Sequence, residues 1–190
     1  MSSLLTAPAA FFRGLPRAGS LRNPLAFAIV CSLIAAAPAA VLVLLFSLVA
    51  GLSGDATSAF GGIFGAFAVL LLYPVATVVG LFVGAGIYHL LVTLLLRHSR
   101  SGFAATFRVA SYGSFPNALG FLAFIPILGI LVGLAIGVYS LILYVLGLRE
   151  VHATTTGKAA LVVFAPVVVG LVLSILFTIV ALVVGAAIGQ

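Results

Sequence analysis

Residues 109–148 read VASYGSFPNALGFLAFIPILGILVGLAIGVYSLILYVLGL and contain no charged side chain. As one straight helix this stretch would be ~60 Å long, which is twice the hydrocarbon thickness of about 30 Å that a membrane span has to cross. Pro116 and Pro126 interrupt it, and a proline usually kinks or breaks a helix because it has no N–H to donate. We therefore predict two helices, over about 109–124 and 127–147, which turn at Ile125-Pro126.

Three other uncharged stretches, 24–53, 56–96 and 159–190, are each long enough to cross a membrane. Strands of a membrane barrel would alternate apolar with polar side chains about every second residue, and no such alternation is present. Only 5% of the 190 residues are charged and 65% are hydrophobic, whereas soluble domains carry about 25% charged residues. The sequence therefore predicts an all-α integral membrane protein.

The positions of the charges predict the number of spans. Eight Lys or Arg residues fall into three segments, and five spans place all three segments on one side, as the positive-inside rule expects for the cytoplasm. This count puts the N-terminus in the cytoplasm and the C-terminus outside. The expected spans are about 24–52, 75–96, 109–124, 127–147 and 159–188.

Two segments are expected to lie outside these spans. Pro74 divides a stretch that is too long for one span, so we predict a separate helical piece over 60–73 at the outer side. Residues 1–22 are expected to form a cytoplasmic or interfacial segment that precedes a membrane domain over 23–190. The apolar residues of this N-terminal segment would dip into the headgroup region; they are Leu4, Leu5, Phe11, Phe12 and Leu15.

Catalytic chemistry finds little support in this sequence. The two acidic residues, Asp55 and Glu150, are predicted on opposite faces of the membrane, so they cannot act as a carboxylate pair. We predict no catalytic residue, no cofactor and no metal site: His98 and His152 lack the Cys or carboxylate neighbours of a typical zinc site. His89 is interpreted as an interfacial anchor. The net charge of +6 is attributed to membrane orientation and not to nucleic-acid binding.

Three groups of residues are candidates for a functional role. The cationic loop residues would contact anionic lipid headgroups or protein partners; they are Arg97, Arg100, Arg108, Arg149 and Lys158. A polar cluster on the 109–124 segment would form interhelical hydrogen bonds or line a cavity; it comprises Tyr112, Ser114 and Asn117. Glycines at four-residue spacing would pack helices within the monomer or form a dimer face; they are Gly129, Gly133 and Gly137.

Short motifs in the middle of the chain resemble the Yip (Ypt-interacting protein) family, especially its prokaryotic branch. The segment 102–112, GFAATFRVASY, followed by Pro116 is similar to that family, as is the segment 147–152, GLREVH. The resemblance implies a five-span membrane protein with a cytoplasmic N-terminus. Eukaryotic relatives bind small GTPases, but the Asp-Leu-Tyr-Gly-Pro signature of their long N-terminal region is missing from this sequence.

These observations favour a non-enzymatic membrane protein of a prokaryotic inner membrane. It would organise the bilayer, or recruit partners, through a basic cytoplasmic face. Its expected partners are anionic lipid headgroups and another membrane protein, which includes a second copy of the chain. The alternative is a passive transporter, channel or lipid scramblase for a neutral or anionic solute.

Overall fold

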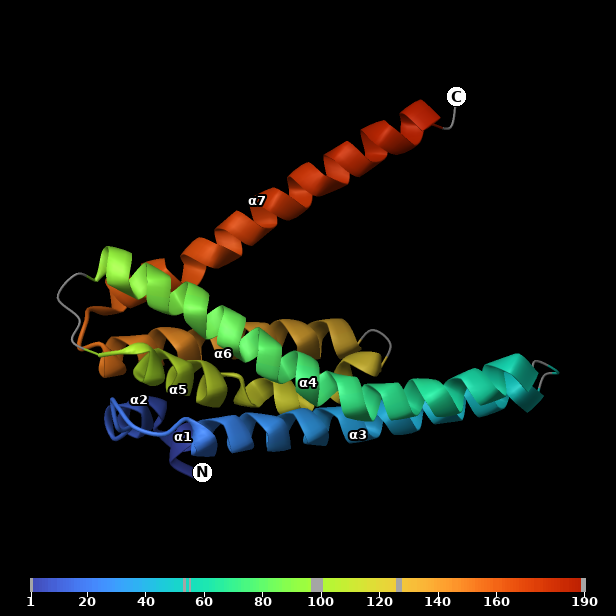
Figure 1. Ribbon diagram of the computed structural model, residues 1–190, viewed down its shortest axis with the longest axis horizontal. Helices are drawn as coiled ribbons and strands as arrows, with labels where there is room; N and C mark the ends of the chain where they lie inside the picture. The colour runs from blue at the N-terminus through green and yellow to red at the C-terminus, as the bar shows by residue number, and fades with distance from the viewer. Residues whose placement is uncertain (1, 53, 55, 97–100, 126–127, 189–190) are drawn as a thin grey trace.

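The computed structural model describes residues 2–52, 54, 56–96, 101–125 and 128–188 (Figure 1). Helices make up 89% of the structure, and the described residues contain no strand, which confirms the predicted all-α class. The elements in chain order are α1 (Ser2–Thr6), α2 (Pro8–Arg13), α3 (Arg22–Leu52), α4 (Ala56–Leu95), α5 (Phe103–Gly113), the 3-10 helix η1 (Phe115–Phe124), α6 (Leu128–Val151) and α7 (Thr156–Ile188).

Four helices in the described part of the chain are long and apolar enough to cross a membrane. They are α3, the Phe60–Leu95 part of α4, α6, and the Thr156–Gly185 part of α7. Helices α3 and α4 form an antiparallel pair that extends beyond the end of α6 (Figure 1). This pair packs closely at Gly62, where a Cβ atom would overlap the side chain of Ser47.

The expected third span over 109–124 is not one α-helix. Helix α5 ends at Gly113, and η1 continues the chain with Pro116 in its first turn, where the missing N–H of a proline costs little. A 3-10 helix rises about 2.0 Å per residue, so this short segment covers more length than an α-helix would. Together α5 and η1 run along the bundle as far as the start of α6, and α6 returns beside them (Figure 1). The chain thus follows the bundle through α3, α4, α5 with η1, and α6, and α7 comes after them.

The prediction that Pro74 separates a 60–73 piece from a later span is wrong. Helix α4 continues through Pro74 from Ala56 to Leu95. A proline removes a single backbone hydrogen bond, and neighbouring helices and Ser or Thr side chains compensate for that loss in membrane helices. Beside this proline, Thr77 donates an additional bond through Oγ1 to the Tyr73 carbonyl oxygen, 2.9 Å away; the carbonyl oxygen that Pro74 leaves without its helical donor is that of Leu70. Helices α3 and α7 likewise continue through Pro38 and Pro166.

The N-terminal segment packs against the protein and not only at the lipid interface. Phe12 in α2 is 0% exposed, and Leu4 is buried in the same hydrophobic cluster as Val92 of α4. A Cβ atom at Gly147 of α6 would overlap Val109 of α5 and lie 3.1 Å from the Phe12 ring of α2. The glycine therefore allows α5 and α2 to pack closely against α6. The expectation that Leu4 and Phe12 dip into headgroups is therefore corrected: both side chains belong to the core. Leu5 remains exposed.

Helix α7 leaves the bundle after its first turns (Figure 1). Its beginning is anchored in the core by Ala159, Val162 and Val163, which are all 0% exposed. The remainder is exposed along its length, and its large side chains are Val, Leu, Ile and Phe. A helix that is hydrophobic on all sides is stable only when lipid or another apolar helix covers it, because exposing this much apolar surface to water is unfavourable.

Candidate functional site at the basic end of the bundle

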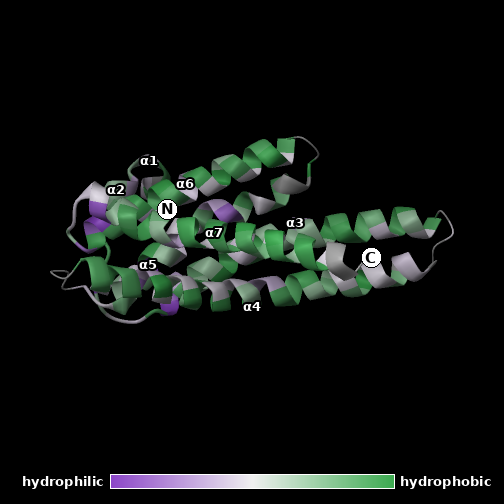
Figure 2. Ribbon diagram, turned by 90° about the horizontal axis from the view of Figure 1, so that it is seen from above, coloured by the Kyte–Doolittle hydropathy of each residue, from purple (hydrophilic) through white to green (hydrophobic). Residues whose placement is uncertain are grey.

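The described cationic residues gather at one end of the bundle, where α2, the start of α5, the end of α6 and the start of α7 meet. Figure 2 shows hydrophilic residues at this end and mostly hydrophobic ones along the long helices. Arg13 of α2 donates through Nε to Glu150 Oε2 of α6, 2.9 Å away. Arg149 also binds Glu150 and donates through Nη1 to Thr156 Oγ1 at the start of α7, at 3.4 Å.

The charge of this end is strongly one-sided. Arg17, Arg22 and Lys158 are exposed to solvent, and Glu150 is the single acidic side chain among the described residues. That carboxylate is shared between Arg13 and Arg149. The remaining cations are therefore not neutralised by the described part of the chain, and this end presents a positive surface. We call the exposed set Arg17, Arg22 and Lys158 the basic end.

Arg108 occupies a different environment from the one predicted for it. Its residue is 4% exposed, and its guanidinium donates to three backbone carbonyl oxygens. Two of these, from Ala18 and Ser20, lie 3.1 and 3.0 Å from Nη2. Arg108 therefore clamps the loop before α3 to α5, and that loop carries Arg17. Two other predicted contact residues, Arg97 and Arg100, lie outside the described residues.

A buried polar chain beneath the basic end was not predicted from the sequence. Thr106 Oγ1 lies 3.0 Å from His152 Nε2 and 3.3 Å from His89 Nδ1. Thr106 is 0% exposed and His152 is 4% exposed. A hydroxyl has one proton to donate and two lone pairs, so Thr106 serves one imidazole as donor and the other as acceptor. The chain joins α4, α5 and the end of α6.

Burial determines the protonation of His152. Desolvation, with electrostatic contributions from His89 and Arg17 as smaller causes, lowers the pKa of His152 to about 4. The imidazole is therefore neutral at pH 7 and can accept the Thr106 proton. Sequence spacing gives no sign of this arrangement, because His89 and His152 lie 17 and 46 residues from Thr106 and meet only in the folded chain. The described residues contain no group of three or more His, Cys, Asp or Glu side chains that could hold a metal ion.

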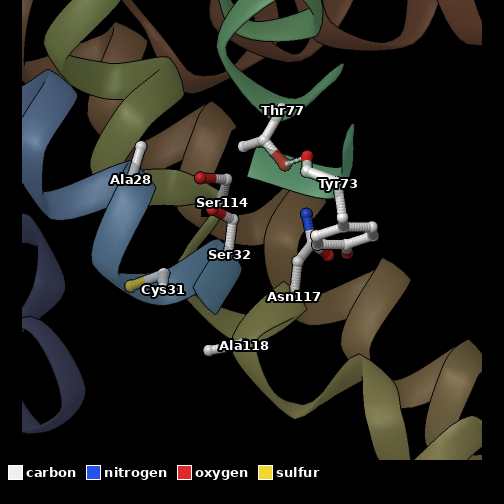
Figure 3. Close-up of a pocket in the computed structure, with 8 residues that line it drawn as sticks. All are labelled: Ala28, Cys31, Ser32, Tyr73, Thr77, Ser114, Asn117 and Ala118. Carbon is white, nitrogen blue, oxygen red and sulfur yellow. Dashed lines mark hydrogen bonds between the residues drawn. The ribbon is translucent and has the colours of Figure 1, made fainter. Parts of the chain in front are cut away.

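The structure brings together two of the three residues predicted to line a cavity. Ser114 and Asn117 line a pocket of about 50 Å³ between α3, α4 and η1, together with Ser32 and Thr77 (Figure 3). Tyr112 lines a different pocket, of about 350 Å³, between the N-terminal segment, α3 and α5, where it lies in edge-to-face contact with Phe11 of α2 at a centroid distance of 5.2 Å. Its role is to pack the N-terminal segment against α5.

The three predicted packing glycines of α6 lie in two different environments. Gly129 is buried. A Cβ atom at Gly133 or at Gly137 would meet no described atom within 4 Å, so these two glycines do not pack helices within the described monomer. Both glycines are exposed on the outer surface of α6, where lipid or another chain has access.

The fold and the basic end define a polytopic helical membrane protein with its cationic residues at one end. The family model of the Yip1 domain matches residues 2–178, so the chain belongs to the Yip1 family. This finding confirms the resemblance drawn from the segments around Phe103–Tyr112 and Gly147–His152. The comparisons with curated proteins and with solved structures gave no match.

Proposed function

We propose that this protein is a non-enzymatic organiser of the membrane that binds anionic lipid headgroups at its basic end. The observation that carries the proposal is the position of Arg17, Arg22 and Lys158, which are exposed together at the end where Arg13 and Arg149 already hold Glu150. Each juxtamembrane Lys or Arg contributes about 1 kcal/mol of attraction to an anionic leaflet. Arg97 and Arg100 would add to the same surface.

Three features of the chain support this proposal. The cations are attached to helices that are long and apolar enough to cross a membrane. The loop that carries Arg17 is fixed by Arg108, so its charge is presented in a defined position. Positive charge on one side favours the cytoplasmic leaflet, and we therefore place the basic end in the cytoplasm, most simply at a prokaryotic inner membrane. An acidic segment of a partner protein would be attracted to the same cationic side chains as an anionic lipid headgroup.

Passive transport receives less support than lipid binding. The pocket at Ser114 and Asn117 has a volume of about 50 Å³, whereas one water molecule has a share of about 30 Å³ in the liquid. A path for a larger solute would have to widen at this polar pocket. Lipid binding needs no such opening, because the basic end is already exposed.

Lipid enrichment around the purified protein tests the proposal. Wild-type protein would be placed in nanodiscs of phosphatidylcholine and phosphatidylglycerol, and the lipids retained after mild detergent extraction would be counted by native mass spectrometry. Replacing Arg17, Arg22 and Lys158 by Gln should abolish most phosphatidylglycerol enrichment. The charge-preserving variant with Arg17→Lys, Arg22→Lys and Lys158→Arg should retain it. Equal enrichment in all three proteins would refute the proposal.

A further inference from the structure

The polar pocket of Figure 3 adjoins an apolar one, with which it shares Tyr73. The polar pocket is lined on α3 by Ala28, Cys31 and Ser32, and the apolar pocket by the next residues of the same helix, Ala35, Ala36, Ala39 and Val43. Both are lined by Tyr73 of α4, and η1 closes both. The apolar pocket has a volume of about 350 Å³, which lies within the range of small-molecule sites, about 300–1,000 Å³. We call the two together the α3–α4 slot.

The slot begins deep in the membrane. Ser32 lies ten residues after Arg22 on the continuous helix α3, which corresponds to ~15 Å along the axis. Since Arg22 belongs to the basic end, the polar pocket lies near the middle of a hydrocarbon core about 30 Å thick. Water is scarce at this depth, so polar side chains there need partners from protein or lipid.

Two polar side chains of the slot lack such a partner. Within the described part of the chain, neither the Asn117 carboxamide nor the Tyr73 hydroxyl forms a hydrogen bond. Asn117 is exposed and Tyr73 is 42% exposed. By contrast, the hydroxyls of Ser32, Thr77 and Ser114 each donate to a backbone carbonyl oxygen of their own segment. An unpaired amide in hydrocarbon costs several kcal/mol, so the two free groups mark a place where a polar ligand is expected.

The chemistry of the slot selects a neutral ligand. Among the described residues, no Asp, Glu, Lys or Arg lines either pocket. A charged headgroup would therefore enter this depth without a counterion from them, at a large desolvation cost. The carboxamide both donates and accepts hydrogen bonds, and the phenol hydroxyl does the same, so together they suit a free hydroxyl group. The small side chains of Ala35, Ala36 and Ala39 leave room for a hydrocarbon chain beside it.

We infer that the α3–α4 slot binds a neutral lipid with a free hydroxyl group, of the diacylglycerol class. Its hydroxyl bonds to Asn117 and Tyr73, and one acyl chain fills the apolar part between α3, α4 and η1. This site is separate from the basic end, which takes anionic headgroups. The two sites would let the protein bind two lipid classes at different depths of one membrane.

Photolabelling tests the inference. The purified full chain in detergent would be labelled with a photoreactive diacylglycerol analogue, and the labelled peptides mapped by mass spectrometry. We expect label on α3 and η1 that excess dioleoylglycerol displaces and dioleoylphosphatidylglycerol does not. Asn117→Leu and Tyr73→Phe should each weaken the competition by about tenfold, since each removes one hydrogen bond to the ligand in a dry site.

A matched pair of variants separates binding from misfolding. Ala39→Leu places bulk in the apolar part of the slot, whereas Ala37→Leu makes the same change at an exposed position of the same helix. Ala39→Leu should reduce labelling at least tenfold while its melting temperature without lipid stays at or above that of the wild type, because it fills space. Ala37→Leu should label normally. Labelling that survives Ala39→Leu, equal displacement by dioleoylphosphatidylglycerol, or a wild-type dimer that Ala39→Leu converts to monomer would overturn the inference.

Discussion

Arg108 Nη2 donates to the carbonyl oxygen of Ser20 at a distance of 3.0 Å, across 88 residues of sequence. Ser20 lies in the loop between α2 and α3, and Arg108 lies on α5, so the bond joins the N-terminal segment to the middle of the bundle. A second bond from the same atom to Ala18 reinforces it. A buried guanidinium that serves backbone carbonyls positions the loop, and through the loop it positions the exposed Arg17.

Substitution of Arg108 should therefore release this loop. Arg108→Ala and Arg108→Lys both remove the two-acceptor geometry, and we expect a loss of about 2 kcal/mol in stability, because hydrogen bonds from charged donors contribute roughly 1.5–3 kcal/mol. Trypsin should cleave after Arg17 faster in both variants than in the wild type. The exposed Lys158→Ala serves as control. Unchanged cleavage at Arg17 in the Arg108 variants would show that the clamp does not hold the loop.

The hydroxyl group of Thr106 should contribute more to stability than the branched shape of its side chain. Thr106→Val keeps the branched side chain but leaves His89 and His152 without the group that joins them. We expect a loss of about 1–3 kcal/mol, the cost of leaving buried polar groups unpaired, seen as a lower melting temperature in detergent. Thr106→Ser should recover part of it. A Thr106→Val protein as stable as the wild type would argue that the three side chains are not coupled.

Stability should fall in mildly acidic solution because of His152. Its pKa is lowered from an ordinary value of 6.5 to about 4 by burial, so the unfolded chain takes up a proton at a pH where the folded chain does not. This group does not lower the free energy of unfolding above pH 6.5. As the pH falls from 6.5 towards 4, protonation of the unfolded chain lowers the free energy of unfolding by about 3 kcal/mol. His89 and Arg17 add repulsion to a protonated His152.

The variant His152→Gln isolates this effect. It removes the titrating group, so the difference in melting temperature between wild type and variant should shrink between pH 7 and pH 4.5. A difference that stays constant across this range would contradict the assignment of the pH dependence to His152.

The open glycines of α6 predict a contact outside the monomer. Gly133→Leu and Gly137→Leu should leave folding unchanged, because a side chain at either position meets open space. If a second copy packs on this glycine face, both variants should shift a dimer to monomer in cross-linking and light-scattering measurements, whereas Ala135→Leu on the same helix should not. Oligomers that persist in both glycine variants would exclude this face as the interface.

The sequence predicted the helical membrane class and the separation of the 109–124 stretch from the helix that follows Ile125-Pro126. These features follow from composition and from local backbone chemistry. Pro74 shows where local reasoning stops: the sequence predicts that this proline divides the 60–96 stretch, but it is accommodated within α4, and tertiary surroundings decide that outcome. The burial of Phe12, the clamp at Arg108 and the meeting of His89 with His152 all depend on contacts between distant segments, which no spacing in the sequence encodes.

The central claim is that the exposed cations form one surface on one side of the membrane. Site-directed labelling tests it most directly, because Cys31 is the only cysteine and can be replaced by Ser. In that background, single cysteines at positions 17, 158 and 57 would be labelled in right-side-out and inverted vesicles with a membrane-impermeant maleimide. We predict that positions 17 and 158 react from the cytoplasmic side and position 57, at the start of α4, from the opposite side. Labelling of positions 17 and 158 from different sides would contradict the claim.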